Sequence, residues 1–258
     1  MTRLGFALSF ASLCGPLMAQ EEPVPSGCRP LFTTSAGVAA PGELELELGA
    51  QRISNRDGSE DSLFPVQFNL GVSRWFDLRF GWSGPMLRKD GQGRAASGDG
   101  DPVFGGQAQF LTQDASGLDL GLAYWHKLPR ASVRKGLGTG RHDDTLVATA
   151  SRVVGRWAFD VNAGANWVGR PEGPGRVRQG VASLAVTYAA GRHLNITFDT
   201  YAMAGTELGP RAVSSVLAVG YGIHENVCLD LGVEAGLTQG APRLSVNAGL
   251  VWRLGKLW

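Results

Sequence analysis

Three glutamates and three leucines alternate in "GELELELG", residues 42–49. An α-helix would scatter both sets around its circumference, whereas a β-strand turns successive side chains to opposite faces. The stretch therefore predicts a strand with one acidic face and one apolar face. Which of the two faces meets water depends on the sequence that follows.

The same alternation continues along most of the chain. After residue 41, apolar side chains recur at every second position in about twelve segments, among them 64–72, 157–167 and 244–254. The positions between them are small or polar, as in the series Asp160, Asn162. No run in this region reaches the 18 or so apolar residues of a transmembrane helix. An even number of alternating strands is typical of bacterial outer-membrane barrels.

The connections between these segments alternate in length. We expect short connections at 74–75, 113–117, 154–156, 190–193 and 224–226; the connection at 239–241 belongs with the longer ones but is short for that class. We expect longer ones at 52–61, 85–101, 128–143, 169–178 and 205–211. Tight turns at one rim and long loops at the other are the arrangement of an outer-membrane barrel.

The aromatic residues supply a further check on this interpretation. With the first strand starting at the periplasmic side, one group lies toward the turns and one toward the loops. The turn group is Phe76, Trp157, Tyr221, Trp252 and Trp258; the loop group is Phe64, Trp82, Phe104, Tyr124 and Trp167. Two aromatic belts that flank an apolar band are typical of membrane interfaces.

These patterns predict an all-β fold, a closed antiparallel transmembrane β-barrel of about 12 strands in the bacterial outer membrane. The leucines of residues 42–49 then face lipid and the glutamates face the lumen. A charged group on the lipid side costs about 2–4 kcal/mol near the membrane midplane, which favours this orientation.

The N-terminus resembles an export signal. Arg3 precedes an apolar run over 4–13, and Ala19 is a small residue suited to cleavage. The expected organisation is a signal peptide over 1–19, a periplasmic or plug segment over 20–40, and the barrel over 41–258.

Several stretches of the chain resemble a known family. They are "RPLFTTSAGVAAPGELELELG" (29–49), "GDPVFGGQAQFL" (100–111) and "HKLPRASVRKGLGTGRHDDTLVATASRVVGRWAFDVNAG" (126–164). Over about 29–258 the sequence is similar to the outer-membrane transporter family named for the meta pathway of phenol degradation. The resemblance implies a small monomeric barrel that carries hydrophobic or aromatic compounds and has no defined catalytic residues.

The expected function is a channel for passive passage of small hydrophobic or aromatic compounds. About twelve strands leave a narrow lumen, between the filled eight-stranded and open sixteen-stranded cases. The candidate lumen-lining residues carry charges of both signs: Glu43, Glu45, Glu47, Arg79, Asp119, Asp160, Asp199, Asp230, Glu234, Arg243 and Arg253. The alternatives are an outer-membrane lipid-modifying enzyme and a non-conducting structural barrel.

The expected partners are outer-membrane lipids, small hydrophobic solutes and, during biogenesis, the barrel assembly machinery. The C-terminal Trp258 fits an assembly signal at the end of the last strand. A formal net charge of +1 offers no electrostatic footprint for nucleic acid.

No motif in the sequence predicts catalysis, a cofactor or a metal. "GLGTG", residues 136–140, lacks the strand–helix context of a phosphate loop. The spacing of His142, Asp143 and Asp144 matches no metal-binding motif. No serine is placed beside a histidine by its spacing, so we expect no enzyme.

Two cysteines, Cys28 and Cys228, remain after removal of the signal peptide. In a closed barrel the last strands return to the first, and the segment before residue 41 is long enough to reach them. A Cys28–Cys228 disulfide is therefore predicted in the oxidising periplasm, with two unpaired thiols as the alternative.

Overall fold

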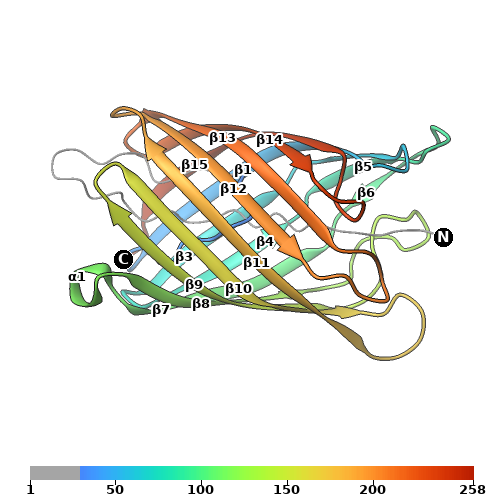
Figure 1. The fold of residues 1–258 in the computed structure, drawn as a ribbon, viewed down its shortest axis with the longest axis horizontal. Coiled ribbons are helices and arrows are strands. Elements are labelled where there is room, and N and C mark those ends of the chain that lie inside the picture. Colours follow the sequence, from blue (N-terminus) through green and yellow to red (C-terminus); the bar gives the residue numbers. More distant parts are fainter. Residues whose placement is uncertain (1–29) are drawn as a thin grey trace.

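The computed structural model describes residues 30–258, which form a closed β-barrel (Figure 1). The expected signal peptide and residues 20–29 lie outside the described residues. The strands are β1 (Glu43–Ser54), β2 (Glu60–Leu63), β3 (Val66–Ser73), β4 (Phe76–Trp82), β5 (Pro85–Lys89), β6 (Ala95–Asp99), β7 (Pro102–Leu111), β8 (Asp119–Lys127), β9 (Asp143–Val154), β10 (Trp157–Gly169), β11 (Arg176–Ala189), β12 (Leu194–Met203), β13 (Ala212–His224), β14 (Val227–Gly236) and β15 (Leu244–Lys256).

The barrel closes where its first strand meets its last. β1 pairs with β15 in antiparallel register, from Glu43 opposite Lys256 to Ser54 opposite Leu244. Every other neighbouring pair is antiparallel as well. Closure leaves no membrane-embedded strand edge with unpaired backbone groups, which hydrocarbon could not solvate. The predicted closed antiparallel barrel is confirmed.

The end of the barrel that carries the longer connections is called the loop end here. Twelve strands form the wall, because β2, β5 and β6 are not separate wall strands but continue three of the twelve toward and past this end. β2 extends β3, β5 extends β4 and β6 extends β7, with interruptions at Phe64-Pro65, Ser83-Gly84 and Gly100-Asp101. Pro65 has no N–H to donate to a sheet ladder, so the first interruption follows from the sequence.

The extensions correct two expectations about the loops. Residues 52–61 and 85–101 were predicted as connections, but β1 reaches Ser54, β2 starts at Glu60, and β5 and β6 form a hairpin over most of 85–101. The turn of this hairpin is built by Asp90, whose Oδ1 accepts the N–H groups of Gln92 and Arg94 at 3.0 and 2.9 Å. Gly93 supplies the positive φ of +80° that the turn requires.

Tight turns occupy the opposite end of the barrel, called the turn end here. The turn between β7 and β8 holds the single helical turn α1 (Gln113–Ser116). The Gln113 N–H donates to Asp119 Oδ1 at 2.8 Å, and its side chain accepts the Val153 N–H at 2.6 Å. Gly117 ends the turn with a φ of 83°. Among residues 30–258, no helix is long and apolar enough to cross a membrane.

The outer surface of the barrel is apolar. Large exposed hydrophobic side chains lie on almost every strand, for example Leu78, Val161, Leu217 and Leu231. Their neighbours in sequence, such as Asp77, Asp160 and Asp230, are almost completely buried. A soluble protein shows the reverse arrangement, whereas an apolar outer face is the pattern of an outer-membrane barrel.

Exposed aromatic residues lie near both ends of the strands. Phe76 and Trp157 begin strands at the turn end, whereas Phe104 and Tyr124 lie near the loop end of theirs. This distribution agrees with the two predicted belts at the membrane interfaces.

Candidate functional site

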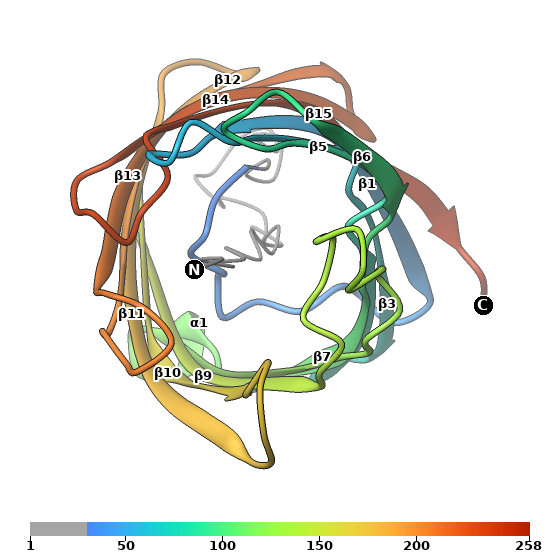
Figure 2. The same ribbon diagram turned by 90° about the vertical axis from the view of Figure 1, so that its right-hand side faces the viewer.

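Residues 30–40 run inside the barrel, and we call them the strap (Figure 2). The strap leaves the barrel wall at the turn end, where the Gly42 N–H donates to Gly71 O at 2.8 Å. A Cβ on Gly71 would lie 1.9 Å from the Ala40 carbonyl oxygen, so only glycine allows the strap to pass this close to β3. On β14, Gly232 makes similar room for Pro30, whose Cγ lies 2.4 Å from the site of a Cβ.

One carboxylate anchors the inner part of the strap. Asp199 on β12 accepts the N–H groups of Phe32 and Thr33 at 2.5 and 3.0 Å and the Thr33 hydroxyl at 2.6 Å. The Asp199 side chain points into the lumen and is fully buried. Three donors directed at one carboxylate fix both the position and the direction of the strap backbone.

Amide side chains hold the middle of the strap. Asn162 on β10 accepts the Thr34 N–H through Oδ1 and donates to the Thr34 carbonyl through Nδ2, both at 2.7 Å. Gln107 on β7 donates through Nε2 to the carbonyl oxygens of Ser35 and Gly37, also at 2.7 Å. These two amide side chains, from strands that only β8 and β9 separate in the wall, thereby satisfy backbone groups that form no sheet.

Two further contacts complete the path toward the turn end. Ser151 Oγ accepts the Ala36 N–H at 2.8 Å and donates to Asp160 at 2.5 Å. Asp77 accepts the Ala39 N–H at 3.3 Å. The wall thus binds the strap chiefly through its backbone, from Phe32 to Ala39.

Arg79 lies where the strap and the wall meet. Its guanidinium donates to both Asp77 carboxylate oxygens at 2.9 and 3.1 Å and to the Thr34 hydroxyl at 3.2 Å. It also lies 6.0 Å from the centroid of the Trp125 ring. Both charged side chains of the ion pair are buried, so their attraction is only weakly screened by solvent.

The acidic face of β1 belongs to a polar network in the turn-end half of the lumen. Glu45 and Glu47 are 2% and 0% exposed, and both accept hydrogen bonds from Asn69 Nδ2, at 3.1 and 2.7 Å. Arg253 Nε lies 3.8 Å from Glu45 and 3.4 Å from Glu43. The structure brings these four predicted lumen residues, Arg253 included, to one side of the barrel.

The other predicted lumen residues are spread over the remaining wall. Asp160, Asp230 and Glu234 are buried in the interior, whereas Asp119 lies at the α1 turn. Arg243 departs from the expectation: it precedes β15, and its side chain is exposed at the loop end. Arg243 has the odd numbering of the inward-facing residues of β15, such as Ser245 and Asn247. Because β15 begins only at Leu244, however, the barrel wall does not surround the Arg243 side chain.

Apolar side chains face inward in the loop-end half of the lumen. Ala123, Trp125, Val147 and Val181 form a buried cluster from β8, β9 and β11. The sequence places Trp125 on a polar track between outward-facing residues, which indicates an inward position but does not single it out. A Cβ on Gly105 would lie 2.8 Å from the indole Cδ1, so this glycine makes room for the ring.

Residues 128–142, which we call the mouth loop, fold inward over one side of the loop-end opening (Figure 2). Asp101 Oδ1 accepts the N–H groups of Arg130 and Ala131, both at 2.7 Å. Leu137, 1% exposed, packs with Leu63 and Met86. The expected glycine-rich loop 136–140 is thus a folded part of the barrel mouth.

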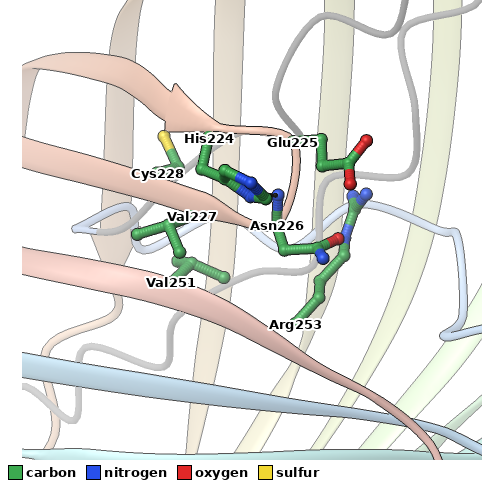
Figure 3. Close-up of a pocket in the computed structure, with 7 residues that line it drawn as sticks. All are labelled: His224, Glu225, Asn226, Val227, Cys228, Val251 and Arg253. Carbon is green, nitrogen blue, oxygen red and sulfur yellow. Dashed lines mark hydrogen bonds between the residues drawn. The ribbon is translucent and has the colours of Figure 1, made fainter.

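A shallow pocket lies at the turn end between the β13–β14 turn and β15 (Figure 3). Figure 3 shows Glu225 and Arg253 pointing toward one another at its edge. Cys228 lines the same pocket and is disulfide-bonded. Cys28 lies outside the described residues, so the Cys28–Cys228 pairing stays a prediction. Within 30–258, no three histidine, cysteine or acidic side chains gather as metal ligands.

Comparison with known proteins agrees with this architecture. The family model described as "Putative MetA-pathway of phenol degradation" matches residues 28–254. No curated protein matches the chain in sequence.

Solved structures show the same fold. The COG4313 outer membrane channel from Pseudomonas putida F1 has a TM-score of 0.69 at 13% identity, covering 85% of this chain and 98% of that one. The NanC porin has a TM-score of 0.58 at 9% identity, with 82% and 100% coverage. The KdgM porin has a TM-score of 0.56 at 7% identity, with 82% and 99% coverage. At these identities the likeness concerns the barrel fold.

Proposed function

The chain belongs to the phenol-degradation pathway family, and on this premise we propose that it is an outer-membrane channel for passive passage of small hydrophobic or aromatic compounds. The proposal assigns no catalytic role to the lumen. Outer-membrane lipids, such solutes and the barrel assembly machinery are its proposed partners.

The observation that carries the proposal is the construction of the lumen. A closed wall isolates the lumen from lipid, and the strap crosses it on side-chain contacts from β4, β7, β9, β10 and β12. A segment held in this way narrows the passage and sets the size of solute that can pass. Most of the strap's described wall contacts are hydrogen bonds, each worth about 0.5–1.5 kcal/mol or somewhat more where a charge takes part.

Apolar side chains in the loop-end half support the solute class. Trp125, Val147 and Val181 form an inward apolar surface directly beside the strap, in contact with Phe32, where a solute and the strap would compete for it. Apolar contact there compensates the loss of water around a hydrophobic solute, by about 25 cal/mol per Å² of apolar surface buried.

Planar-bilayer conductance and liposome swelling test the proposal. Removal of residues 20–40 is expected to raise single-channel conductance, because the lumen loses its occupant. Asn162→Ala, which breaks both contacts to Thr34, is expected to raise conductance less. The matched control Asn55→Ala changes an amide in the β1–β2 loop and should leave conductance unchanged.

Solute selectivity completes the test. Swelling should be faster with phenol-like solutes than with sugars of similar mass. Unchanged conductance after strap removal, together with no solute flux, would favour a non-conducting structural barrel. Turnover of labelled phospholipid by the purified protein would favour a lipid-modifying enzyme.

A further inference from the structure

The strap places one aromatic ring against the barrel wall. The Phe32 ring stacks on the Tyr201 ring of β12, with 4.1 Å between ring centroids and an interplanar angle of 12°. Tyr201 is only 3% exposed, so almost none of its ring surface is open to a solute while Phe32 is in place. Near-parallel stacking at this distance is a favourable arrangement for two aromatic rings.

The surroundings of the Phe32 ring form a slot with distinct sides. Phe32 packs against the inward apolar cluster that includes Trp125, Val147 and Val181. At the edge of the slot, the Tyr201 hydroxyl donates to Glu234 Oε1 at 2.5 Å. The slot therefore offers a flat aromatic face, apolar walls and a polar edge, which is the chemistry that recognises a single aromatic ring carrying a hydroxyl.

The slot belongs to the wall, whereas the ring that fills it belongs to the strap. The strap backbone at this point is held by Asp199 through the Phe32 and Thr33 N–H groups. Leu31 has its own apolar contacts with Val216 and Ala218. The strap thus has anchors on both sides of Phe32 that do not depend on its ring.

We propose that the Tyr201 slot is a binding site for single-ring aromatic solutes and that Phe32 occupies it as a competitor within the same chain. A solute ring can stack on Tyr201 only where the Phe32 ring has moved away. A tethered competitor is present at high effective concentration, so it lowers the apparent affinity of the slot for a free solute. The proposal gives the channel function proposed above a site for its solute, and in that respect rests on it.

Calorimetric titration of the folded mature protein in detergent tests the proposal, with phenol as the probe and a micelle-only blank. Phe32→Ala is expected to raise the affinity for phenol by between about twofold and tenfold, the range of one aromatic stack. Cyclohexanol, which carries the same hydroxyl on a ring without a π-system, should gain much less. Tyr201→Leu added to Phe32→Ala should remove the gain.

Leu31→Ala is the matched control, because it loosens the strap beside Phe32 without vacating the slot. Its phenol affinity should equal that of the parent protein. An equal gain in Leu31→Ala and Phe32→Ala would overturn the proposal, since general loosening of the strap would then explain it. An equal gain for cyclohexanol and phenol, or a gain that survives Tyr201→Leu, would overturn it as well.

A second variant covers the case in which Phe32→Ala does not fold, as judged by heat-dependent migration in gels. Phe32→Leu keeps an apolar side chain but cannot stack, so a smaller gain in phenol affinity is expected. No gain from Phe32→Leu would overturn the proposal in that case.

Binding and transport can fail separately. Phenol binding at Tyr201 without solute flux would refute the channel and leave the slot in place. Flux that is indifferent to Phe32, with no calorimetric gain, would refute the slot and leave the channel in place.

Discussion

The two halves of the lumen are built from different chemistry. In the turn-end half the lumen wall carries buried polar side chains such as Glu45, Asn69 and Asp77, of which Asp77 accepts a hydrogen bond from the strap. In the loop-end half, Trp125 and Val181 present apolar surface, although the wall of β14 and β15 remains polar there through Glu234 and Ser245. The comparison supports the proposed division of roles, in which the apolar half receives a hydrophobic solute and the polar half holds the segment that restricts its passage.

The largest expected effect comes from Arg79, which joins the two halves by contacting both Asp77 and the Trp125 ring. Arg79→Leu leaves the buried Asp77 carboxylate without its cation, which should destabilise the barrel by about 3–5 kcal/mol. Urea unfolding in lipid vesicles measures this loss. The double variant Asp77→Asn, Arg79→Leu should recover part of it, and strict additivity of the two single losses would contradict the pairing.

In the apolar half, the next largest effect is expected at Leu137. Leu137→Ala opens a cavity between the mouth loop and Met86, which costs about 2–5 kcal/mol for a fully buried leucine. Because the loop lies outside the barrel wall, the loss should appear as faster amide exchange over 128–142 rather than as global unfolding. Leu208→Ala, at an exposed leucine of another loop, is the control and should exchange as the parent does.

Asp101 separates the contribution of charge from that of packing in the same loop. Asp101→Asn keeps an oxygen that can accept from Arg130 or Ala131 but removes the negative charge near Lys127. We expect a loss of about 1–3 kcal/mol in loop stability, read as increased protease cleavage between residues 128 and 142. Asp114→Asn in the exposed α1 turn should leave cleavage unchanged.

The smallest effect is expected at the rim of the polar half. Arg253→Gln removes a partly exposed guanidinium that lies 3.4 Å from Glu43. Partly exposed ion pairs contribute about 0–1 kcal/mol, so the urea midpoint should shift little, and less still at high salt. A loss of stability as large as that of Arg79→Leu would contradict this expectation and would show that the polar network depends on Arg253.

Alternation alone predicts most of the barrel wall. The leucines and glutamates of β1 lie on opposite faces, and the number of wall strands, twelve, agrees with the prediction. The interruption at Pro65 and the turn at Asp90 each depend on one residue. An analysis of alternating apolar and polar positions does not detect such single residues.

The strap contacts could not be read from the sequence in the same way. Phe32 and Asp199 are 167 residues apart, and Thr34 and Asn162 are 128 apart, so their contacts exist only once the wall has closed. In the sequence, Asn162 and Gln107 are simply two of many polar residues that alternate with apolar ones. The strap has no regular secondary structure, so no repeating sequence pattern predicts which wall residues it contacts.

The position of Gly42 has a consequence for how the molecule is assembled. The Leu257 N–H donates to Gly42 O at 2.8 Å, so the strap enters the lumen beside the seam at which β15 completes the cylinder on β1. During biogenesis β15 must therefore pair with β1 next to the point where the strap turns into the lumen. Insertion of the strap and pairing of β15 with β1 therefore take place at the same site. A fault in one of these two steps would leave the other incomplete.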